Sequence, residues 1–310
     1  MLTGQYLKRK YLEGKNIIDL LKKNSKNHAF DNFIEVSYDL QSGSYIKGIK
    51  EFENTDVGLR IKNHRHKLYS EISRFGHINS LLEAGIGEAT TLVPVLKQLN
   101  NKKLDAYGFD ISWSRIAFAK QWCNKHDLKP NLFVGDMCNI PLVNNAIDVV
   151  FTSHAIEPNH GKEKMILNEL YRVARKGLVL IEPAYEFATQ AQKKRMDKHG
   201  YCRGLKDIVL SLGFNVVKHE LIDYGSGIHG INPDNPAAIL IIEKDTQEKT
   251  EENVLACPIY KTPLKRMGDH YYSEDSLSIF PVIQDIACLK KECAIVASYY
   301  SSFLNKEIDL

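Results

Sequence analysis

A short glycine-containing segment followed by an acidic residue is the first feature of this sequence that could do chemistry. The segment Glu83–Ala89 contains Gly85 and Gly87, and Asp110 ends the next apolar run, 25 residues after Gly85. Two glycines two positions apart let the backbone turn tightly and approach a ligand closely. A carboxylate at Asp110 can accept hydrogen bonds from ribose hydroxyls. Because Ala89 stands at the third glycine position, this pair alone indicates only nucleotide binding of a general kind.

Three further details favour an adenosyl ligand over a dinucleotide. Glu83 lies two residues before the first glycine, where a carboxylate repels a pyrophosphate but can receive an ammonium group. Asp136 and Met137 follow the third apolar run, and an acid there can accept a hydrogen bond from an adenine amino group. Ser153 and His154 come at the end of the fourth run, beside the same predicted site.

Short apolar runs must position these residues, and they alternate with stretches of helical spacing at Ile116–Trp122 and Met165–Ala174. The alternation predicts an α/β fold with βαβ units, a mostly parallel sheet and helices on both faces. Open sheets of this kind bind ligands at the carboxyl ends of their strands. The five runs are Ser80–Ala84, Leu104–Asp110, Asn131–Gly135, Ile147–Thr152 and Gly177–Glu182.

A later pair of runs, Phe214–Ile222 and Ala237–Glu243, is separated by a segment rich in Gly, Asn and Pro. We interpret the pair as two strands joined by a long loop, residues 223–236, which could reach the site.

The glycine segment, Asp110, the pair Asp136–Met137 and the pair Ser153–His154 follow one another along the chain. Their order resembles the order of motifs in the class I S-adenosylmethionine (SAM)-dependent methyltransferases, over about residues 35–243. Glu169–Val173 and Val179–Pro183 look like the helix and fifth strand of that family, whereas Ala89 departs from its motif. The resemblance implies a seven-stranded, Rossmann-like methyltransferase sheet and SAM as the cofactor. It further implies the residues that contact SAM, which are Tyr45, Glu83, Gly85, Gly87, Asp110, Ile111, Asp136, Met137 and Ser153.

The assignment of Tyr45 depends on the lead-in Tyr38–Tyr45, which resembles the Tyr-Asp-x-x-Ala-x-x-Tyr segment of many of these enzymes. In that family the second tyrosine covers the methionine end of SAM. A loop with a buried tyrosine is the alternative interpretation.

Methyl transfer from a sulfonium mainly requires an aligned nucleophile and the exclusion of water. A hydroxyl nucleophile also needs a base that takes its proton. The candidates are His154, Glu157 and His160, because they follow the fourth strand where the methyl group is expected to point. The alternative is structural: His160 caps the next helix and Glu157 holds a backbone amide.

A second group of candidates follows the fifth strand, where this family usually builds its substrate wall. Glu182 and Tyr185 can hydrogen-bond a polar acceptor, and His199 or Arg203 can bind an anionic one. Residues on a solvent-facing helix surface are the alternative. The Asn-Pro-Pro-aromatic motif of amino-directed nucleic-acid methylases is absent, which disfavours DNA base methylation.

The composition is that of an ordinary globular protein, with 44% hydrophobic and 25% charged residues. The 41 Lys and Arg against 38 Asp and Glu give a net charge of +3, which argues against a dedicated nucleic-acid binder. No apolar run reaches the roughly 18 residues of a membrane helix. Six cysteines without a Cys-x-x-Cys pattern fit reduced thiols, so we expect a cytoplasmic protein.

We expect four segments: an N-terminal helical cap and lead-in (1–75), the SAM-binding core (76–243), a charged linker (244–253) and a small β-rich domain (254–310). The basic residues of 1–30 indicate a solvated helical face or a patch for an anionic partner.

The last segment contains Cys257-Pro258-Ile259-Tyr260 and the run Phe280–Ile286. These features resemble the zinc-ribbon-like domains that act as methyltransferase activators. Tyr260 stands where that family has its second cysteine, and no second pair follows, so we expect no metal site. The domain is expected to pack against its own core or a partner chain.

The function we expect is SAM-dependent methyl transfer to a small polar acceptor, with a hydroxyl of a sugar or of a surface-polysaccharide precursor as the first choice. The activator-like tail and the basic N-terminus leave a tRNA or RNA methyltransferase as one alternative. A non-catalytic SAM-binding module of a larger assembly is the other. The oligomeric state stays open, with a homodimer as one option.

Overall fold

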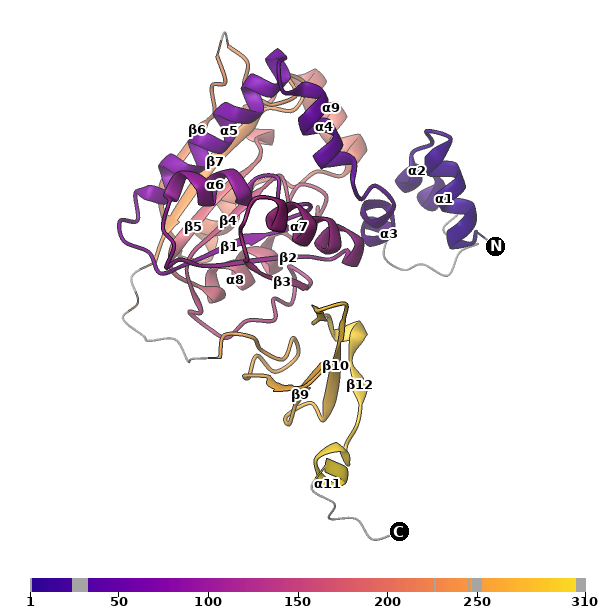
Figure 1. Ribbon diagram of the computed structural model, residues 1–310. Helices are drawn as coiled ribbons and strands as arrows, with labels where there is room; N and C mark the ends of the chain where they lie inside the picture. The colour runs from indigo at the N-terminus through magenta and orange to yellow at the C-terminus, as the bar shows by residue number, and fades with distance from the viewer. Residues whose placement is uncertain (1, 24–32, 226, 245, 247–252, 305–310) are drawn as a thin grey trace.

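A central sheet covered by helices on both faces forms the body of the protein (Figure 1). The computed structural model describes residues 2–23, 33–225, 227–244, 246 and 253–304. Parallel strands pair in the order β5-β4-β1-β2-β3. Their bounds are β1 Ser80–Ala84, β2 Asp105–Asp110, β3 Asn131–Val134, β4 Ile147–Ser153 and β5 Ala174–Pro183. The middle strands consist mainly of apolar residues because helices cover both of their faces.

The predicted pair of later strands is confirmed. β6 (Asn215–Leu221) and β7 (Ala237–Glu243) are antiparallel to each other, and β7 is also antiparallel to β5. All residues of β7 except its last are buried, since it lies between two neighbours in the sheet.

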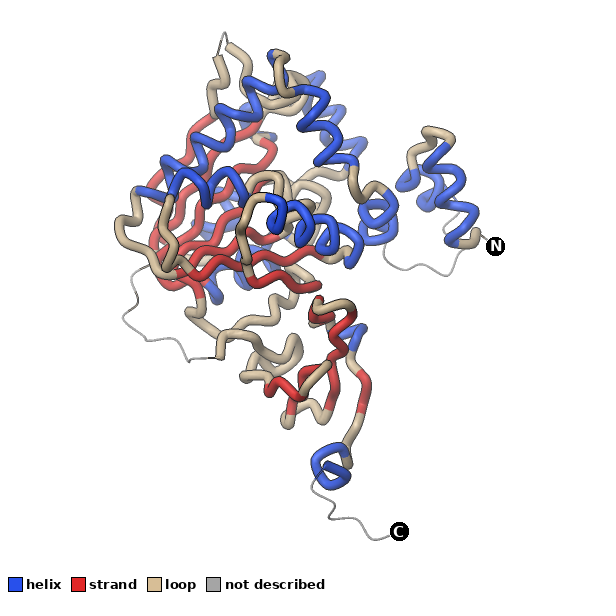
Figure 2. The backbone as a smooth tube through the Cα atoms, viewed as in Figure 1, coloured by secondary structure: helices blue, strands red, loops and turns tan. Residues whose placement is uncertain are grey.

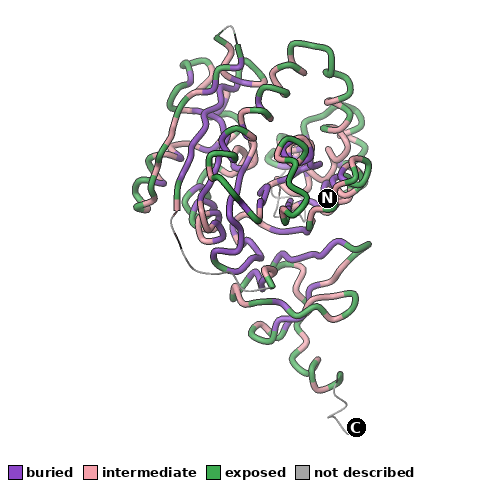
Figure 3. Tube along the Cα trace, turned by 60° about the vertical axis from the view of Figure 1, so that its left-hand side comes forward, coloured by how far each residue is buried: buried purple, intermediate pink, exposed green. Residues whose placement is uncertain are grey.

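Two layers of helices enclose the sheet and build two apolar clusters. α5 (Asp56–Ser73), α6 (Leu92–Leu99) and α7 (Trp113–Lys125) contribute to one cluster. α8 (Glu163–Val173) and α10 (Leu205–Ser211) contribute to the other. Figure 3 shows the resulting pattern, with buried residues along the strands and exposed residues on the outer helix surfaces. No helix among the described residues is both long and apolar enough to cross a membrane.

The N-terminal helices form a small bundle beside this body. α1 (Gly4–Leu12) and α2 (Ile17–Lys23) pack on α3 (Phe33–Leu40) through Leu7, Ile17 and Leu21, and α4 (Ser44–Phe52) follows. α5, which we assigned to the cap, instead buries Leu68 and Ile72 in the core. The domain boundary at residue 75 stays a prediction.

The sheet does not stop at seven strands, which corrects the predicted fold. Among the described residues it has 12 strands, since β11 (Ile286–Cys288) pairs in parallel with β3 and extends the sheet into the C-terminal segment (Figure 2). An edge strand leaves a row of unpaired backbone groups, and β11 satisfies those of β3. Antiparallel strands follow it: β10 (Ser278–Ile283), β9 (His270–Ser273), β8 (Lys265–Met267) and β12 (Ile295–Val296).

The C-terminal segment also packs into the core of its own chain. Cys257, Leu264, Phe280 and Leu289 are fully buried in the cluster that contains Phe133 of β3. The segment therefore covers the edge and one end of the sheet. Most of the predicted linker, residues 245 and 247–252, lies outside the described residues. Two more helices lie in the second half of the chain, α9 (Gln190–His199) and the short α11 (Tyr300–Leu304).

Candidate active site

A cavity opens where β1, β2, β3 and β4 end, at the edge of the sheet that the sequence predicted for a ligand. His154 lines it. So do all nine predicted cofactor contacts, namely Tyr45, Glu83, Gly85, Gly87, Asp110, Ile111, Asp136, Met137 and Ser153.

The loop after β1 adopts a conformation that suits glycine. Gly85 has φ +72°, and a Cβ atom placed on it would lie 2.5 Å from the Cβ of Ala155. Gly87 has φ +54°. Ala89 replaces the third glycine of the motif and still adopts a positive φ of 57°. The loop therefore keeps the left-handed turn of the motif at all three positions.

Asp110 holds this loop against the end of β2. One carboxylate oxygen accepts a hydrogen bond from the Gly87 N–H at 2.9 Å, and the other accepts one from the Ser112 N–H at 3.0 Å. Burial raises the pKa of Asp110, while the nearby Arg115 and these N–H groups oppose that shift. The remaining lone pairs can accept from hydroxyl groups of a ligand.

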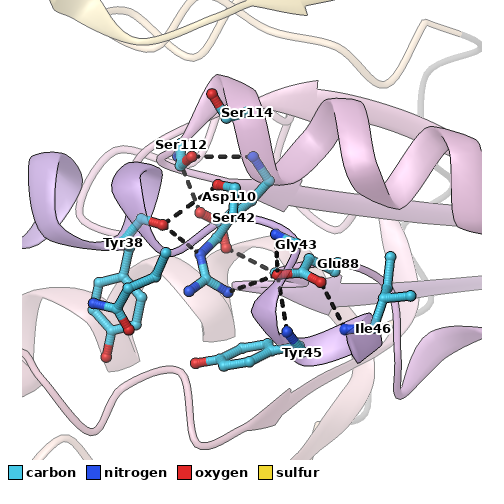
Figure 4. A network of polar contacts seen from close by, with 12 residues as sticks. Tyr38, Ser42, Gly43, Tyr45, Ile46, Glu88, Asp110, Ser112 and Ser114 are labelled. Carbon is cyan, nitrogen blue, oxygen red and sulfur yellow. Dashed lines mark hydrogen bonds and ion pairs between the residues drawn. The ribbon is translucent and has the colours of Figure 1, made fainter. Parts of the chain in front are cut away.

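The buried carboxylate of Glu88 attaches the lead-in segment to the glycine loop (Figure 4). It accepts hydrogen bonds from the N–H groups of Gly43 (2.9 Å), Tyr45 (3.3 Å) and Ile46 (2.8 Å). These are free N–H groups at the start of α4, where a negative charge is favourable. Glu88 thus places Tyr45 at the cavity, a role that the sequence analysis missed.

Asp39 makes a second attachment of the lead-in, to the start of α7. Its carboxylate accepts from the Ser112 hydroxyl at 2.7 Å and from the Ser114 N–H at 3.1 Å. The Ser112 hydroxyl in turn accepts from the N–H of Arg115 at 3.1 Å and so caps the helix. Tyr38 and Tyr45 are consequently held over the ligand cavity from two sides.

Arg115 is a buried cation in the cavity wall that sequence reasoning also missed. Its side chain is 1% exposed, and its Nε donates to the Tyr38 carbonyl at 3.0 Å. The guanidinium carbon lies 4.3 Å from the ring centre of Tyr45 and 4.9 Å from that of Tyr38. Nη1 lies 3.9 Å from Glu88, whereas Nη2 is buried without a hydrogen-bond partner within the described part of the chain.

Glu83 presents an unsatisfied group of the opposite charge. Its Oε2 is buried and has no partner among the residues that the structure describes. Burial raises the pKa of Glu83 well above its ordinary value, and the Leu92 N–H and the charge of Arg65 offset this only in part. Glu83 and Arg115 line the same cavity, so a ligand with one cationic and one anionic group would satisfy both.

His154 and Glu157 form a hydrogen-bonded pair at the end of β4. Their Nδ1 and Oε2 atoms lie 2.9 Å apart, and His154 has a positive φ of 55°. Burial disfavours the protonated imidazole, but the hydrogen bond and charge of Glu157, together with the charge of Glu182, outweigh it, so the pKa of His154 is raised. Its Nε2 is buried and unpartnered among the described residues. This nitrogen is free to accept a proton from a bound molecule.

A second histidine, His64 of α5, lies behind Ser153. Its Nδ1 is 2.7 Å from the Tyr224 hydroxyl and its Nε2 is 2.8 Å from the Ser153 hydroxyl. Burial, followed by the neighbouring His154, lowers the pKa of His64 well below its ordinary value. A neutral His64 therefore orients the Ser153 side chain.

The long loop 223–236 reaches the site, as predicted. Tyr224 contacts His64, and the amide of Asn235 donates to Glu157 at 3.4 Å.

Glu182 does not line the cavity, and its assignment to the substrate wall stays a prediction. Its buried carboxylate accepts from the N–H groups of Ala155 (3.0 Å), Ile156 (3.1 Å) and Glu157 (3.0 Å). Burial raises the pKa of Glu182 to about 7, against the opposing charge of His154 and these N–H groups. It fixes the loop that carries the histidine–glutamate pair.

The lining of this cavity does not include Tyr185, Arg203, His160 or His199. Tyr185 stacks beneath Arg203, whose guanidinium pairs with Asp197 at 2.7 Å. His160 is exposed, and its Nδ1 is 2.9 Å from Glu163 at the start of α8. This contact resembles the alternative role of His160 as a cap of the next helix. These side chains have partners on the protein surface, which a single sequence does not reveal. His199 lines a second cavity next to the first.

Comparisons with known proteins agree with this geometry. Residues 81–177 match the family model of a methyltransferase domain. The crystal structure of magnesium protoporphyrin IX methyltransferase (ChlM) from Synechocystis PCC 6803 with bound SAH has a TM-score of 0.51 and 13% identity, and it covers 67% of this chain and 98% of that chain. The same enzyme with bound SAM has a TM-score of 0.50 and 13% identity, over 71% of this chain and 100% of that one.

The tRNA N(3)-methylcytidine methyltransferase Mettl2 of Drosophila melanogaster is 26% identical over 161 residues, or 45% of this chain. The chain covers 49% of the length of that protein. Residues 81–177 are therefore similar to a methyltransferase domain, and the fold of the chain is similar to that of ChlM. The likeness of its C-terminal segment to methyltransferase activators stays a prediction.

Proposed function

We propose that the protein is a SAM-dependent methyltransferase and that SAM binds in the cavity at the strand ends. The unsatisfied Oε2 of Glu83 and Nη2 of Arg115 carry this proposal, because the methionine part of SAM has one ammonium and one carboxylate group. Asp110 suits the ribose hydroxyls, and Asp136 with Met137 suits the adenine.

SAM, when bound, supplies a methyl group on a sulfonium, which in-line displacement moves to a nucleophile while the carbon–sulfur electron pair stays on sulfur. The chain has to align the acceptor and keep water out. Tyr38 and Tyr45, held by Asp39 and Glu88, form the wall that excludes water. His154 takes the acceptor proton at Nε2 in this scheme.

The pairing of His154 with Glu157 supports an acceptor that must lose a proton. Glu157 stabilises the imidazolium that forms, because its carboxylate accepts the hydrogen bond from Nδ1. A hydroxyl has to release its proton, whereas a ring nitrogen with a free lone pair does not. We therefore put a hydroxyl of a small sugar-containing molecule first, including surface-polysaccharide precursors.

RNA is the second candidate acceptor. The observation that favours it is the match to Mettl2, which is named as a tRNA methyltransferase and is matched over about half of its length. Transfer of a methyl group to tRNA by the purified protein, and none to sugar nucleotides, would favour this candidate over the first.

Isothermal titration with S-adenosylhomocysteine tests the proposed cofactor. The wild-type protein is expected to bind it, and Asp110→Ala is expected to bind at least about tenfold more weakly, because hydrogen bonds to a charged group contribute about 1.5–3 kcal/mol each. Asp148→Asn is the matched control. Asp148 is also buried and accepts the Asn79 N–H at 2.7 Å, but it does not line the cavity.

The control variant should lose stability and keep its affinity for S-adenosylhomocysteine. No binding by the wild-type protein, or equal losses in both variants, would refute the proposed cofactor site.

The proposed base has its own test. His154→Ala is expected to keep S-adenosylhomocysteine binding and to lose transfer of labelled methyl from SAM, with partial recovery in added imidazole. Full activity of this variant would remove His154 from the proposal.

A further inference from the structure

A second cavity lies between the N-terminal helices and α9. It shares Tyr38, Tyr45 and Pro158 with the proposed SAM cavity, so the two spaces adjoin. Glu157, the partner of His154, also lines it. A molecule in this second cavity is therefore next to the reacting end of the first. We call this second cavity the acceptor groove.

The helical hairpin at the N-terminus positions the outer wall of the groove. Leu7, Ile17 and Leu21 are fully or almost fully buried against α3, which fixes α2 relative to α1. The turn between these helices contains Gly14, with φ +77°, and brings Lys15 to the groove. Lys22 directly follows the buried Leu21 on α2 and also lines the groove.

The groove has an excess of positive charge. Lys15, Lys22 and Lys198 line it from two sides, and their side chains form no ion pair within the described residues. Two acids line it as well. Glu157 already accepts a hydrogen bond from His154, which leaves Asp19 as the other carboxylate of the described lining.

The state of His199 agrees with this distribution of charge. His199 lines the groove, and burial, followed by the positive charges of Arg195 and Lys198, lowers its pKa. Asp19 and Glu157 act in the opposite direction but do not outweigh them. The groove is thus a place where a further cation is unfavourable and an anion is favourable.

We propose that the acceptor carries a phosphate group, which Lys15, Lys22 and Lys198 hold in the groove while the nucleophile of the acceptor reaches Nε2 of His154. This inference rests on the proposed function, since it names the substrate class of the same site. Lysine ammonium groups suit phosphate as separate point charges, and the several oxygens of a phosphate can accept from all three. With this assignment, basic residues of the N-terminal segment bind an anionic ligand.

Two probes separate the sources of such a phosphate: uridine diphosphate glucose and a transcribed tRNA, each titrated into protein saturated with S-adenosylhomocysteine. Glucose without phosphate is the negative control. The groove variant replaces Lys15, Lys22 and Lys198 with glutamine. The matched variant replaces Lys102, Lys103 and Lys129 with glutamine. These lysines are also exposed, and they lie just before β2 and β3, at the ends of those strands that face away from the proposed SAM cavity.

One of the two phosphate probes is expected to bind, and glucose is not. The groove variant loses three exposed charge contacts and should bind that probe roughly tenfold more weakly. The matched variant should bind it like the wild type, and all three proteins should bind S-adenosylhomocysteine equally.

The outcomes separate the inference from the proposed function. If the wild type fails to bind S-adenosylhomocysteine, the proposed function falls, and the acceptor assignment with it. If it binds S-adenosylhomocysteine but neither phosphate probe, only the acceptor inference is overturned. Equal losses in the groove and matched variants would also overturn it, because they would show that the probe responds to net charge alone. If only the groove variant binds uridine diphosphate glucose more weakly, the acceptor is a small phosphorylated molecule. If only the groove variant binds tRNA more weakly, the phosphate belongs to an RNA backbone.

Discussion

Replacement of Gly85 with alanine is expected to destabilise the protein and to deform the proposed SAM cavity. The new Cβ would lie 2.5 Å from the Cβ of Ala155 and 3.0 Å from Cε of Met137. Carbon atoms in contact are normally about 3.5–4.0 Å apart. The flexible end of Met137 can move away, but Ala155 cannot do so easily because its N–H donates to the buried Glu182.

Two costs add up in this variant. The left-handed backbone at φ +72° costs an alanine about 1–2 kcal/mol. Overpacking against Ala155 costs about 1–3 kcal/mol more. The free energy of unfolding should therefore fall by about 2–5 kcal/mol, a large fraction of the roughly 5–15 kcal/mol typical of a folded domain.

Equilibrium unfolding in urea measures this loss, with Gly213→Ala as the matched control. Gly213 has φ +76° and nothing within 4 Å of a Cβ placed on it, so this variant reports the backbone cost alone. The difference between the two variants should be about 1–3 kcal/mol. Adding Ala155→Gly to the Gly85→Ala protein removes the close contact and should restore most of that difference, together with S-adenosylhomocysteine affinity.

Equal losses in Gly85→Ala and Gly213→Ala would refute the reasoning, because the steric contribution would then be absent. A double variant no more stable than Gly85→Ala would show that Ala155 is not the residue in conflict.

Three further predictions concern the pair at the site, the histidine behind it and the C-terminal segment. Glu157→Gln should move the acid limb of the pH–rate profile to lower pH, because the carboxylate holds the pKa of His154 up and the rate is lost as pH falls through that pKa; an unmoved limb would contradict the assignment of the base. Tyr224→Phe should lower the free energy of unfolding by about 1–3 kcal/mol, since the buried nitrogen of His64 loses its partner; unchanged urea unfolding would show that this contact contributes nothing. Removal of residues 254–310 should sharply reduce soluble, cooperatively unfolding protein, because it exposes the edge of β3 and a buried apolar surface; a fully stable truncated protein would mean that this segment is a separate unit.

Much of the site is predictable from the sequence because its parts are local. The glycines mark the turn after β1, and three of the apolar runs end at or next to a residue that lines the cavity. Asp110, Asp136 and Ser153 therefore reach one edge once the strands are parallel. Strand length and alternation with helices depend on near neighbours in the chain, which a pattern of residue types records.

The supporting residues were not predictable in the same way. Glu88 and Arg115 are charged side chains whose sequence context looks solvent-exposed, yet both are fully or nearly fully buried. Their partners come from the lead-in segment, more than 40 residues away from Glu88 and about 77 from Arg115. Glu182 is a further case: its place after the fifth strand predicts a substrate contact, and the sequence does not reveal that its carboxylate holds three backbone N–H groups of a neighbouring loop.

The sequence by itself determined the class of fold, the glycine loop and the order of polar residues at the strand ends, since backbone freedom and hydrophobic periodicity are local properties. Only the tertiary structure decided that His64 meets Tyr224, 160 residues further on, and that β11 pairs with β3 to extend the sheet. It also decided that Lys15 and Lys198 line one groove. Such pairings depend on which distant segments pack together, and the free energy of that packing is summed over the whole chain.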